Sequence, residues 1–330
     1  RRRGIEQRTI FGLALVLVLT LGVAAGLGLA ARAPAEGEAP PASTATLRSH
    51  VIAALTAITT VTATPAPSAT PIATPEPLVG PKTGMRMLYL APGPFRMGND
   101  EGQPEEAPAH MLRMNAYFID ETEVTNGHYA ACVEDGACRP PATSRATFHE
   151  AYYGDPDFAN YPVLFVSWFA ARDFCNWREA RLPTEAEWER AASFDFSEGI
   201  KTIYPWGDEF DGLRLNFCDA GCWTENRNSE FDDGQVDTAP VMHYPAGQSA
   251  AGLYDMAGNV MEWVNDWYDS AYYARSSEIH PLGPLEGEVK AIRGGSWLSN
   301  ADEVRTTSRT SFEPAVSRAN LGFRCAVSAP

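Results

Sequence analysis

The chain of 330 residues has few basic side chains, because 26 lysines and arginines stand against 42 aspartates and glutamates. Its formal net charge is −16 at pH 7. A nucleic-acid-binding protein needs a basic surface that neutralises phosphates. The composition therefore argues against that class of protein, and we expect no nucleic-acid partner.

The sequence also lacks the short motifs of several enzyme classes. Its 6 histidines form neither H-E-x-x-H nor another close metal-binding spacing. There is no G-x-S-x-G nucleophile motif, no phosphate-binding P-loop and no C-x-x-C-H haem attachment site. These absences argue against zinc hydrolases, α/β-hydrolases, P-loop NTPases and c-type cytochromes.

Long regular helices are not expected in the folded part of the chain. The sequence has 27 glycines and 25 prolines, which favour turns and interrupt helices. Hydrophobic residues nevertheless make up 45% of it and charged residues only 21%, which is enough to build a buried core. We therefore expect an α+β domain with a large irregular fraction.

One long apolar run lies near the N-terminus, over residues 10–31, and arginines precede it at positions 1–3 and 8. A helix needs about 20 such residues to cross a bilayer. Because basic flanks stay in the cytoplasm, the pattern predicts a single-pass anchor in the inner (cytoplasmic) membrane, with residues 1–9 as a cytoplasmic tail. The rest of the chain would lie on the extracytoplasmic (periplasmic) side. The alternative is a signal peptide cleaved near residues 29–31.

A segment of low complexity follows, because residues 32–82 are dominated by alanine, proline and threonine. Such a composition cannot bury enough apolar surface to fold alone, and repeated proline favours an extended polyproline conformation. We expect a semi-stiff tether, in which the proline-free residues 47–61 are either a docking segment or more spacer. The composition changes after it, and residues 83–330 are predicted to form one globular domain.

The elements expected in this domain are short. Strand-like patterns cover residues 86–90, 110–119 and 289–293. Helix starts are indicated at Thr125, at Ser167 and at Thr184, where Glu187 completes a capping box.

The helix expected over residues 167–178 has an apolar side. We expect that side to consist of Phe169, Ala170, Phe174 and Trp177.

The 6 cysteines all follow the predicted anchor, where conditions are often oxidising. Cys132 and Cys138 flank an acidic glycine turn, and Cys218 and Cys222 flank another short turn, so each pair can close a small loop. Cys175 and Cys325 would remain as a long-range bridge. The rival is a four-cysteine zinc site built from the two short-loop pairs, although Cys132 and Cys138 are spaced more widely than usual zinc ligands.

A series of short motifs runs through the predicted domain in a fixed order. They are Gly93–Gly98 (GPFRMG), Glu123–Asn126 (EVTN), Pro162–Trp168 (PVLFVSW), Arg181–Glu189 (RLPTEAEWE), Tyr204–Gly207 (YPWG), Gly252–Val260 (GLYDMAGNV), Glu262–Trp263 (EW), Arg293–Trp297 (RGGSW) and Asn320–Arg324 (NLGFR). In order and spacing this series resembles the formylglycine-generating enzyme (sulfatase-modifying factor) family. The resemblance implies a variant C-type-lectin-like fold, and it favours the bridge between Cys175 and Cys325.

The resemblance also implies what chemistry to look for. Enzymes of this family oxidise a substrate cysteine with copper(I) held by two cysteines, as suits a soft ion. The matching positions here are Ser299 and Val304. A hydroxyl is a poor ligand for copper(I), and a valine side chain is none, so we expect no copper and no oxidase activity.

Calcium is the metal that the resemblance favours, because it prefers carboxylate and carbonyl oxygens. A first site would use the side chains of Asn216 and Asp233 with the carbonyls of Phe217 and Gln235. A second site would use the carboxylates of Asp255 and Glu262 with the carbonyls of Gly258 and Val260. The alternative is that these acids cap turns or face water.

Three functions follow from these observations. The first is a non-catalytic, membrane-anchored accessory subunit of a membrane protein complex; such domains resemble accessory subunits of electron-transfer assemblies, including the quinol-oxidising alternative complex III. The second is a ligand- or glycan-binding module, with residues 297–318 as the binding surface and Trp297, Arg305, Arg309 and Arg318 as candidate contacts. The third is a residual enzyme related to formylglycine generation.

Overall fold

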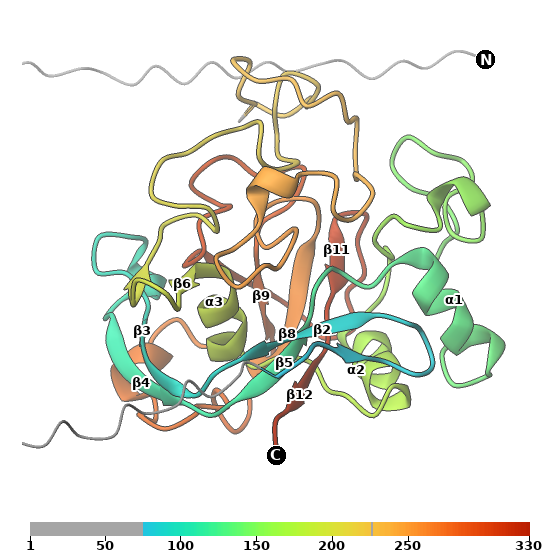
Figure 1. Cartoon of the computed structure of the whole chain (residues 1–330). Helices are drawn as coiled ribbons and strands as arrows, with labels where there is room; N and C mark the ends of the chain where they lie inside the picture. Colours follow the sequence, from blue (N-terminus) through green and yellow to red (C-terminus); the bar gives the residue numbers. More distant parts are fainter. Residues whose placement is uncertain (1–74, 226) are drawn as a thin grey trace, which may run out of the picture. The chain divides into compact units, whose positions relative to one another are not determined.

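The computed structural model describes residues 75–225 and 227–330 of the chain (Figure 1). The anchor predicted over residues 10–31 and most of the tether predicted over 32–82 lie outside the described residues, so both stay predictions. Within the described ranges no helix is both long enough and apolar enough to span a membrane.

Four short strands form the first sheet, in the order β1–β2–β5–β12. β1 (Leu78–Val79), β2 (Arg86–Leu90), β5 (Tyr117–Asp120) and β12 (Ala326–Ser328) all pair antiparallel. The predicted strand over 86–90 is β2. Because β1 lies in the segment assigned to the tether, the sheet begins before residue 83. Because β12 pairs with β5, the end of the chain lies against the first elements of the domain (Figure 1).

The second sheet has the order β10–β9–β8–β11. It consists of β8 (Met261–Trp267), β9 (Lys290–Arg293), β10 (Arg309–Phe312) and β11 (Leu321–Phe323). β11 runs parallel to β8, and the other pairs are antiparallel. β9 is the strand predicted over 289–293, and its last residue, Arg293, is the first residue of the RGGSW motif.

Two hairpins complete the strands. β3 (Gly93–Met97) pairs with β4 (His110–Met114), and β6 (Phe194–Asp195) pairs with β7 (Ile200–Lys201). The single strand predicted over 110–119 is in fact two strands, β4 and β5, because the chain passes from the hairpin into the first sheet between them.

Three helices have the caps that the sequence predicts. They are α1 (Asn126–Glu134), α2 (Trp168–Trp177) and α3 (Glu185–Ser193). The side chain of the residue before each helix accepts a hydrogen bond from a backbone N–H of the first turn. The expected capping box is formed, because Glu187 accepts a bond from the backbone N–H of Thr184.

The buried face of α2 differs from the predicted one. Its buried residues are Trp168, Ala171, Phe174 and Cys175. Phe169 is 44% exposed, although it was expected on the apolar side. Trp168 turns inward because its indole N–H donates a 2.8 Å hydrogen bond to the carbonyl of Val264 on β8.

Helix α3 is buried along its whole length and packs on β3, β8 and β9 (Figure 1). Its three glutamates therefore lie in the interior and need cationic partners. The pairs are Glu185 with Arg309, Glu187 with Arg181, and Glu189 with both Lys201 and Arg293. The RLPTEAEWE motif thus provides the carboxylates of a buried ion-pair network and one of its cations, Arg181.

All three predicted disulfides are present. They join Cys132 to Cys138, Cys175 to Cys325, and Cys218 to Cys222. No free cysteine remains, so the alternative of a four-cysteine zinc site is excluded. The bridge from Cys175 fastens α2 to the segment just before β12.

Most of the chain between β7 and β8 is loop. The short 3₁₀ helices of the domain are η1 (Pro104–Glu106), η2 (Pro156–Phe158), η3 (Pro245–Gly247) and η4 (Tyr272–Arg275). Of the described residues from 202 to 260, only those of η3 belong to a helix or strand. This long loop region carries most of the predicted calcium ligands.

Candidate functional site

A polar hollow of about 520 Å³ lies between the chain that follows the RGGSW motif and the strands β9 and β10. Its lining includes Met261, Ile292, Ser299, Arg309, Arg318 and Asn320. The floor is apolar, because Met261 and Ile292 are buried, and the rim is polar. This hollow contains one of the two positions that correspond to the copper ligands of the resembled family.

The two replaced positions have different surroundings. Ser299 lines the hollow, and its carbonyl accepts a 2.9 Å hydrogen bond from the backbone N–H of Cys218. Val304 is fully buried in an apolar cluster with Leu215 and Phe217. Gly295 leaves room for it, since a Cβ there would lie 2.8 Å from a methyl carbon of Val304. A hydroxyl and a hydrocarbon therefore occupy the positions where the resemblance requires two thiols.

The arginines of this region are mostly engaged inside the domain. Arg305 donates bonds of 2.8 and 2.6 Å to the two carboxylate oxygens of Glu106. Although burial opposes ionisation, hydrogen bonds from Arg305 and Thr307 hold the pKa of Glu106 below its ordinary value. Arg309 forms a similar two-bond pair with Glu185. These two guanidinium groups have structural roles.

Arg318 differs from them. It is exposed, and its guanidinium lies 4.1 Å from the ring centre of Phe312. Within the part of the chain that the structure describes, it makes no ion pair with a carboxylate. Of the four contacts predicted for a ligand-binding surface, Trp297 is buried and two are paired, so Arg318 is the one that a ligand in the hollow can reach.

The second predicted calcium set lies in the interior beside a third carboxylate. Both oxygens of Glu262 accept hydrogen bonds from Arg324, at 2.7 to 3.0 Å. Asp255 accepts a 3.0 Å bond from the backbone N–H of Met242. Glu123, which the sequence marks only as part of the EVTN motif, accepts a 3.0 Å bond from the backbone N–H of Val260. Sequence reasoning gave it no role.

These three carboxylates share one nearby cation. Burial, together with the charges of Asp255 and Glu262, raises the pKa of Glu123 well above its ordinary value. Burial also raises the pKa of Asp255 to about 6. The guanidinium of Arg324 offsets only part of this negative charge. An additional cation is therefore compatible with the donor chemistry at this place.

The first predicted calcium set lies next to the second. A Cβ on Gly258 would lie 2.1 Å from the carbonyl oxygen of Asn216, so the two segments are in close contact. The amide nitrogen of Asn216 donates a 2.7 Å bond to the carbonyl of Asp237. The carbonyl of Phe217 accepts a 2.9 Å bond from the N–H of Asp219. Both ligand sets thus meet where the loop region crosses the GLYDMAGNV motif.

Asp233 has an acidic neighbour in this first set. Burial raises its pKa to about 7, and the charge of Asp219 adds to the effect. Its carboxylate accepts bonds from the N–H of Gln235, at 2.8 Å, and from the hydroxyl of Tyr244, at 3.1 Å. Among the described residues neither Asp219 nor Asp233 pairs with a basic side chain. This donor set also suits a hard cation.

Side chains alone do not complete a metal site. In the described ranges no three His, Cys, Asp or Glu side chains converge closely enough to hold an ion. A calcium ion at either place would need backbone carbonyls as well, as the sequence predicts for Phe217, Gln235, Gly258 and Val260. Calcium therefore stays a prediction.

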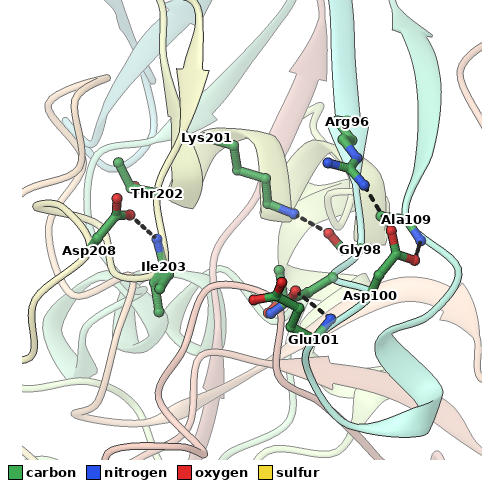
Figure 2. A pocket seen from close by; sticks show the side chains of 11 residues that line it. Arg96, Gly98, Asp100, Glu101, Ala109, Lys201, Thr202, Ile203 and Asp208 are labelled. Atoms are coloured by element: carbon green, nitrogen blue, oxygen red, sulfur yellow. Dashed lines mark hydrogen bonds and ion pairs between the residues drawn. The ribbon is translucent and has the colours of Figure 1, made fainter. Parts of the chain in front are cut away.

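A second hollow, of about 440 Å³, lies between the β3–β4 hairpin and β7 (Figure 2). The ammonium of Lys201 donates bonds to the carbonyl of Gly98, at 2.8 Å, and to Glu189, at 2.6 Å. Arg96 pairs with Asp100 at the rim. These charged groups are therefore paired within the fold.

The comparisons with known proteins agree with this fold and these motifs. Residues 75–329 match the sulfatase-modifying factor enzyme 1-like domain of the FGE-sulfatase family. The chain is 36% identical over 289 residues to the formylglycine-generating enzyme of Streptomyces coelicolor, which covers 74% of this chain and 90% of that enzyme. It is 30% identical over 288 residues to the inactive C-alpha-formylglycine-generating enzyme 2 of Bos taurus, covering 73% of this chain and 88% of that protein.

Another relative is much longer than the domain. The serine/threonine-protein kinase pkn1 of Chlamydia caviae is 34% identical over 262 residues, and the match covers 73% of this chain but only 37% of the kinase. The chain thus spans little more than a third of that relative.

Two solved structures share the fold. PvdO from Pseudomonas aeruginosa superimposes with a TM-score of 0.62 at 25% identity, covering 77% of this chain and 98% of that one. Treponema denticola variable protein 1 gives a TM-score of 0.61 at 24% identity, covering 77% and 99%. The fold, the order of the motifs and the matched residues lead to one conclusion: the chain belongs to the FGE-sulfatase family of sulfatase-modifying factor-like domains.

Proposed function

We propose that this domain is a non-catalytic member of its family and serves as an accessory subunit of a membrane protein complex. The observation that carries the proposal is the absence of a thiol: Ser299 and Val304 stand at the copper positions, and all 6 cysteines of the chain are disulfide-bonded. Copper(I) chemistry of the family type needs a pair of thiolates. The family also includes a relative named as inactive, at 30% identity.

The remainder of the proposal concerns where the domain works. The apolar run at residues 10–31 and the proline-rich segment after it would anchor the domain and hold it outside the inner membrane. A tethered domain that has no catalytic activity would act by binding neighbouring proteins. We propose a quinol-oxidising electron-transfer assembly as the complex, because domains of this kind resemble accessory subunits of such assemblies.

Calcium belongs to the same proposal as a structural ion. Burial raises the pKa of Glu123, Asp255 and Asp233, so a bound cation would be needed to hold these three carboxyl groups ionised. An ion that binds only the folded state stabilises it. Calcium would thus fix the long loop region between β7 and β8, which has little hydrogen-bonded regular structure of its own.

Ligand binding in the hollow beside Ser299 is a second candidate function. It is favoured by Arg318, the exposed guanidinium that lines the hollow without a carboxylate partner among the described residues. A glycan and peptide array probed with the soluble domain tests this alternative. Binding that disappears in Arg318→Ala supports it, and no binding across the array argues against it.

Extraction of the tagged full chain from its native membrane in a mild detergent tests the main proposal. We expect it to elute with integral membrane subunits in a fixed ratio, and with residues 10–31 still attached by mass spectrometry of the intact chain. A matched control replaces residues 1–31 by a cleavable signal peptide. A full chain that elutes alone as a monomer contradicts the proposal.

A further inference from the structure

Two aromatic side chains on different loops are exposed and in contact with each other. Phe148 is 51% exposed and Trp223 is 54% exposed. Their ring centres lie 5.2 Å apart in an edge-to-face arrangement. Trp297, which is buried, continues the row at 5.3 Å from Trp223. Isolated exposed aromatic residues need no explanation, but this pair also lines a shallow hollow.

The hollow has a volume of about 450 Å³ and is lined by Thr147, Phe148, Gly221 and Trp223. It is separate from the hollow that contains Ser299, and it borders the first predicted calcium set, because a Cβ on Gly221 would lie 3.3 Å from the carbonyl oxygen of Gln235. We call these four residues the aromatic platform. The loop that carries Trp223 lies at the top of the view in Figure 1, far from β12.

The platform is held rigidly on the Trp223 side. The bridge between Cys218 and Cys222 ends at the residue before Trp223. The N–H of Cys218 donates to the carbonyl of Ser299, and its carbonyl accepts a 2.9 Å bond from the N–H of Asn228. A binding surface that is already ordered loses less entropy when a ligand arrives.

Buried carboxylates lie directly behind the platform. Asp219 accepts a 2.8 Å bond from the backbone N–H of Gly221. Asp237 accepts a 3.3 Å bond from the backbone N–H of Phe148, and its nearest basic group is His149, at 3.4 Å. Gly221 and Phe148, which line the hollow from two different loops, therefore each donate a backbone N–H to a buried carboxylate.

The surrounding surface is acidic as well. The segment 219–237 contains six acidic residues and one basic residue, Arg227. Glu225, Glu230 and Asp232 are its exposed acids. An electron-rich indole face surrounded by carboxylates attracts organic cations, for which tryptophan is the best aromatic partner.

We propose that the aromatic platform binds a basic peptide segment of a partner protein, with an arginine or lysine side chain on Trp223 and Phe148. Acids distributed along segment 219–237 suit several successive basic residues better than a single small ammonium ion. The platform gives the domain a docking surface for a partner of opposite charge, which is independent of the altered copper positions.

The test uses the full chain in mild detergent and a fluorescein-labelled decapeptide of alternating glycine and arginine, followed by fluorescence anisotropy. We expect saturable binding that weakens with salt. Trp223→Ala and Phe148→Ala should each weaken it by about three- to thirtyfold, the range of a lost cation–aromatic contact. The double variant E225Q/D232N should weaken it and reduce its salt dependence.

Leu285→Ala is the matched control, because this leucine is fully exposed at 101% and lies outside the platform. Melting curves confirm that each variant is folded. Equal binding by wild type and Trp223→Ala overturns the proposal. Equal binding of a glycine–glutamate or glycine–leucine peptide also overturns it, as does a site that takes phosphocholine but not the arginine peptide.

Discussion

The backbone N–H of Cys218 donates a 2.9 Å hydrogen bond to the carbonyl of Ser299. A sulfur-bearing residue thus lies beside the position where the family resemblance places a copper ligand. That sulfur is bonded to Cys222 in the disulfide, so it is no thiolate. The contact fixes the backbone at Ser299 but supplies no thiolate there.

The first prediction concerns copper. Wild-type protein should bind no copper(I) in competition with a chromophoric chelator, and should form no aldehyde on a peptide containing Cys-x-Pro-x-Arg. The double variant S299C/V304C should gain copper(I) binding at about one ion per chain, because thiolates suit this soft ion. The enzyme of Streptomyces coelicolor is the positive control, and aldehyde formation by the wild type would refute the non-catalytic assignment.

The second prediction compares two disulfides. Cys175–Cys325 closes a loop with a sequence separation of 150, and Cys132–Cys138 one of only 6. The chain-entropy model gives a loss of about 5 kcal/mol for C175A/C325A and about 2 kcal/mol for C132A/C138A. Urea unfolding of both variants measures the difference. A larger loss for the short loop would contradict this reasoning.

The third prediction concerns pH. Burial, with the charge of Glu185, raises the pKa of Asp266 to about 8. The folded state then binds a proton that the unfolded state releases near pH 4. Stability from this group is therefore present at acidic pH and is lost as the pH rises toward 8.

Asp266→Asn should remove this dependence. At about 1.4 kcal/mol per pH unit, this group should lower the free energy of unfolding by up to about 4 kcal/mol as the pH rises from 5 to 8. Asparagine keeps an acceptor for the N–H of Glu185, which bonds to Asp266 at 2.9 Å. Thermal unfolding from pH 5 to pH 8 should be flatter for this variant, and Glu150→Gln, at an exposed position, should behave like wild type. An unchanged slope would contradict the argument.

The fourth prediction concerns calcium. Adding calcium to chelator-treated protein should raise the melting temperature. A hundredfold excess over the dissociation constant should increase the free energy of unfolding by about 2.7 kcal/mol. Asp233→Asn and Asp255→Asn should each weaken one site, since affinity follows ligand charge. Asp232→Asn is the control on the same loop. Calorimetry that finds no calcium binding would refute the proposal for both sites.

Local sequence patterns determined the parts of the fold in which neighbours in the chain decide the structure. The cap at Thr184 and the capping box with Glu187 formed as predicted, because both partners lie within one helical turn. The prediction of the buried face of α2 was wrong, because aromatic residues lie on both sides of this helix. The buried side is set by contacts with residues distant in the chain, such as the hydrogen bond from Trp168 to Val264.

The candidate sites show the same division. Ser299 and Val304 are identified by their distance along the chain from the RGGSW motif, which the sequence alone provides. The carboxylate of Glu123 was missed because its partners Asn259 and Val260 lie more than a hundred positions away, at separations of 136 and 137. The aromatic platform was missed for the same reason, since Phe148 and Trp223 belong to separate loops.

The sequence by itself determined the family motifs, the helix caps, the two short-loop disulfides and the absence of cysteine at positions 299 and 304, because each depends on residue identity and short spacing. The bridge between Cys175 and Cys325, with a separation of 150, followed from the pairing of the other four cysteines and from the family resemblance. Tertiary structure alone decided which charges are neutralised in the interior and which groups meet across loops. The physical reason is that burial and Coulomb interactions depend on distance in space, and the fold brings together side chains that are far apart along the chain.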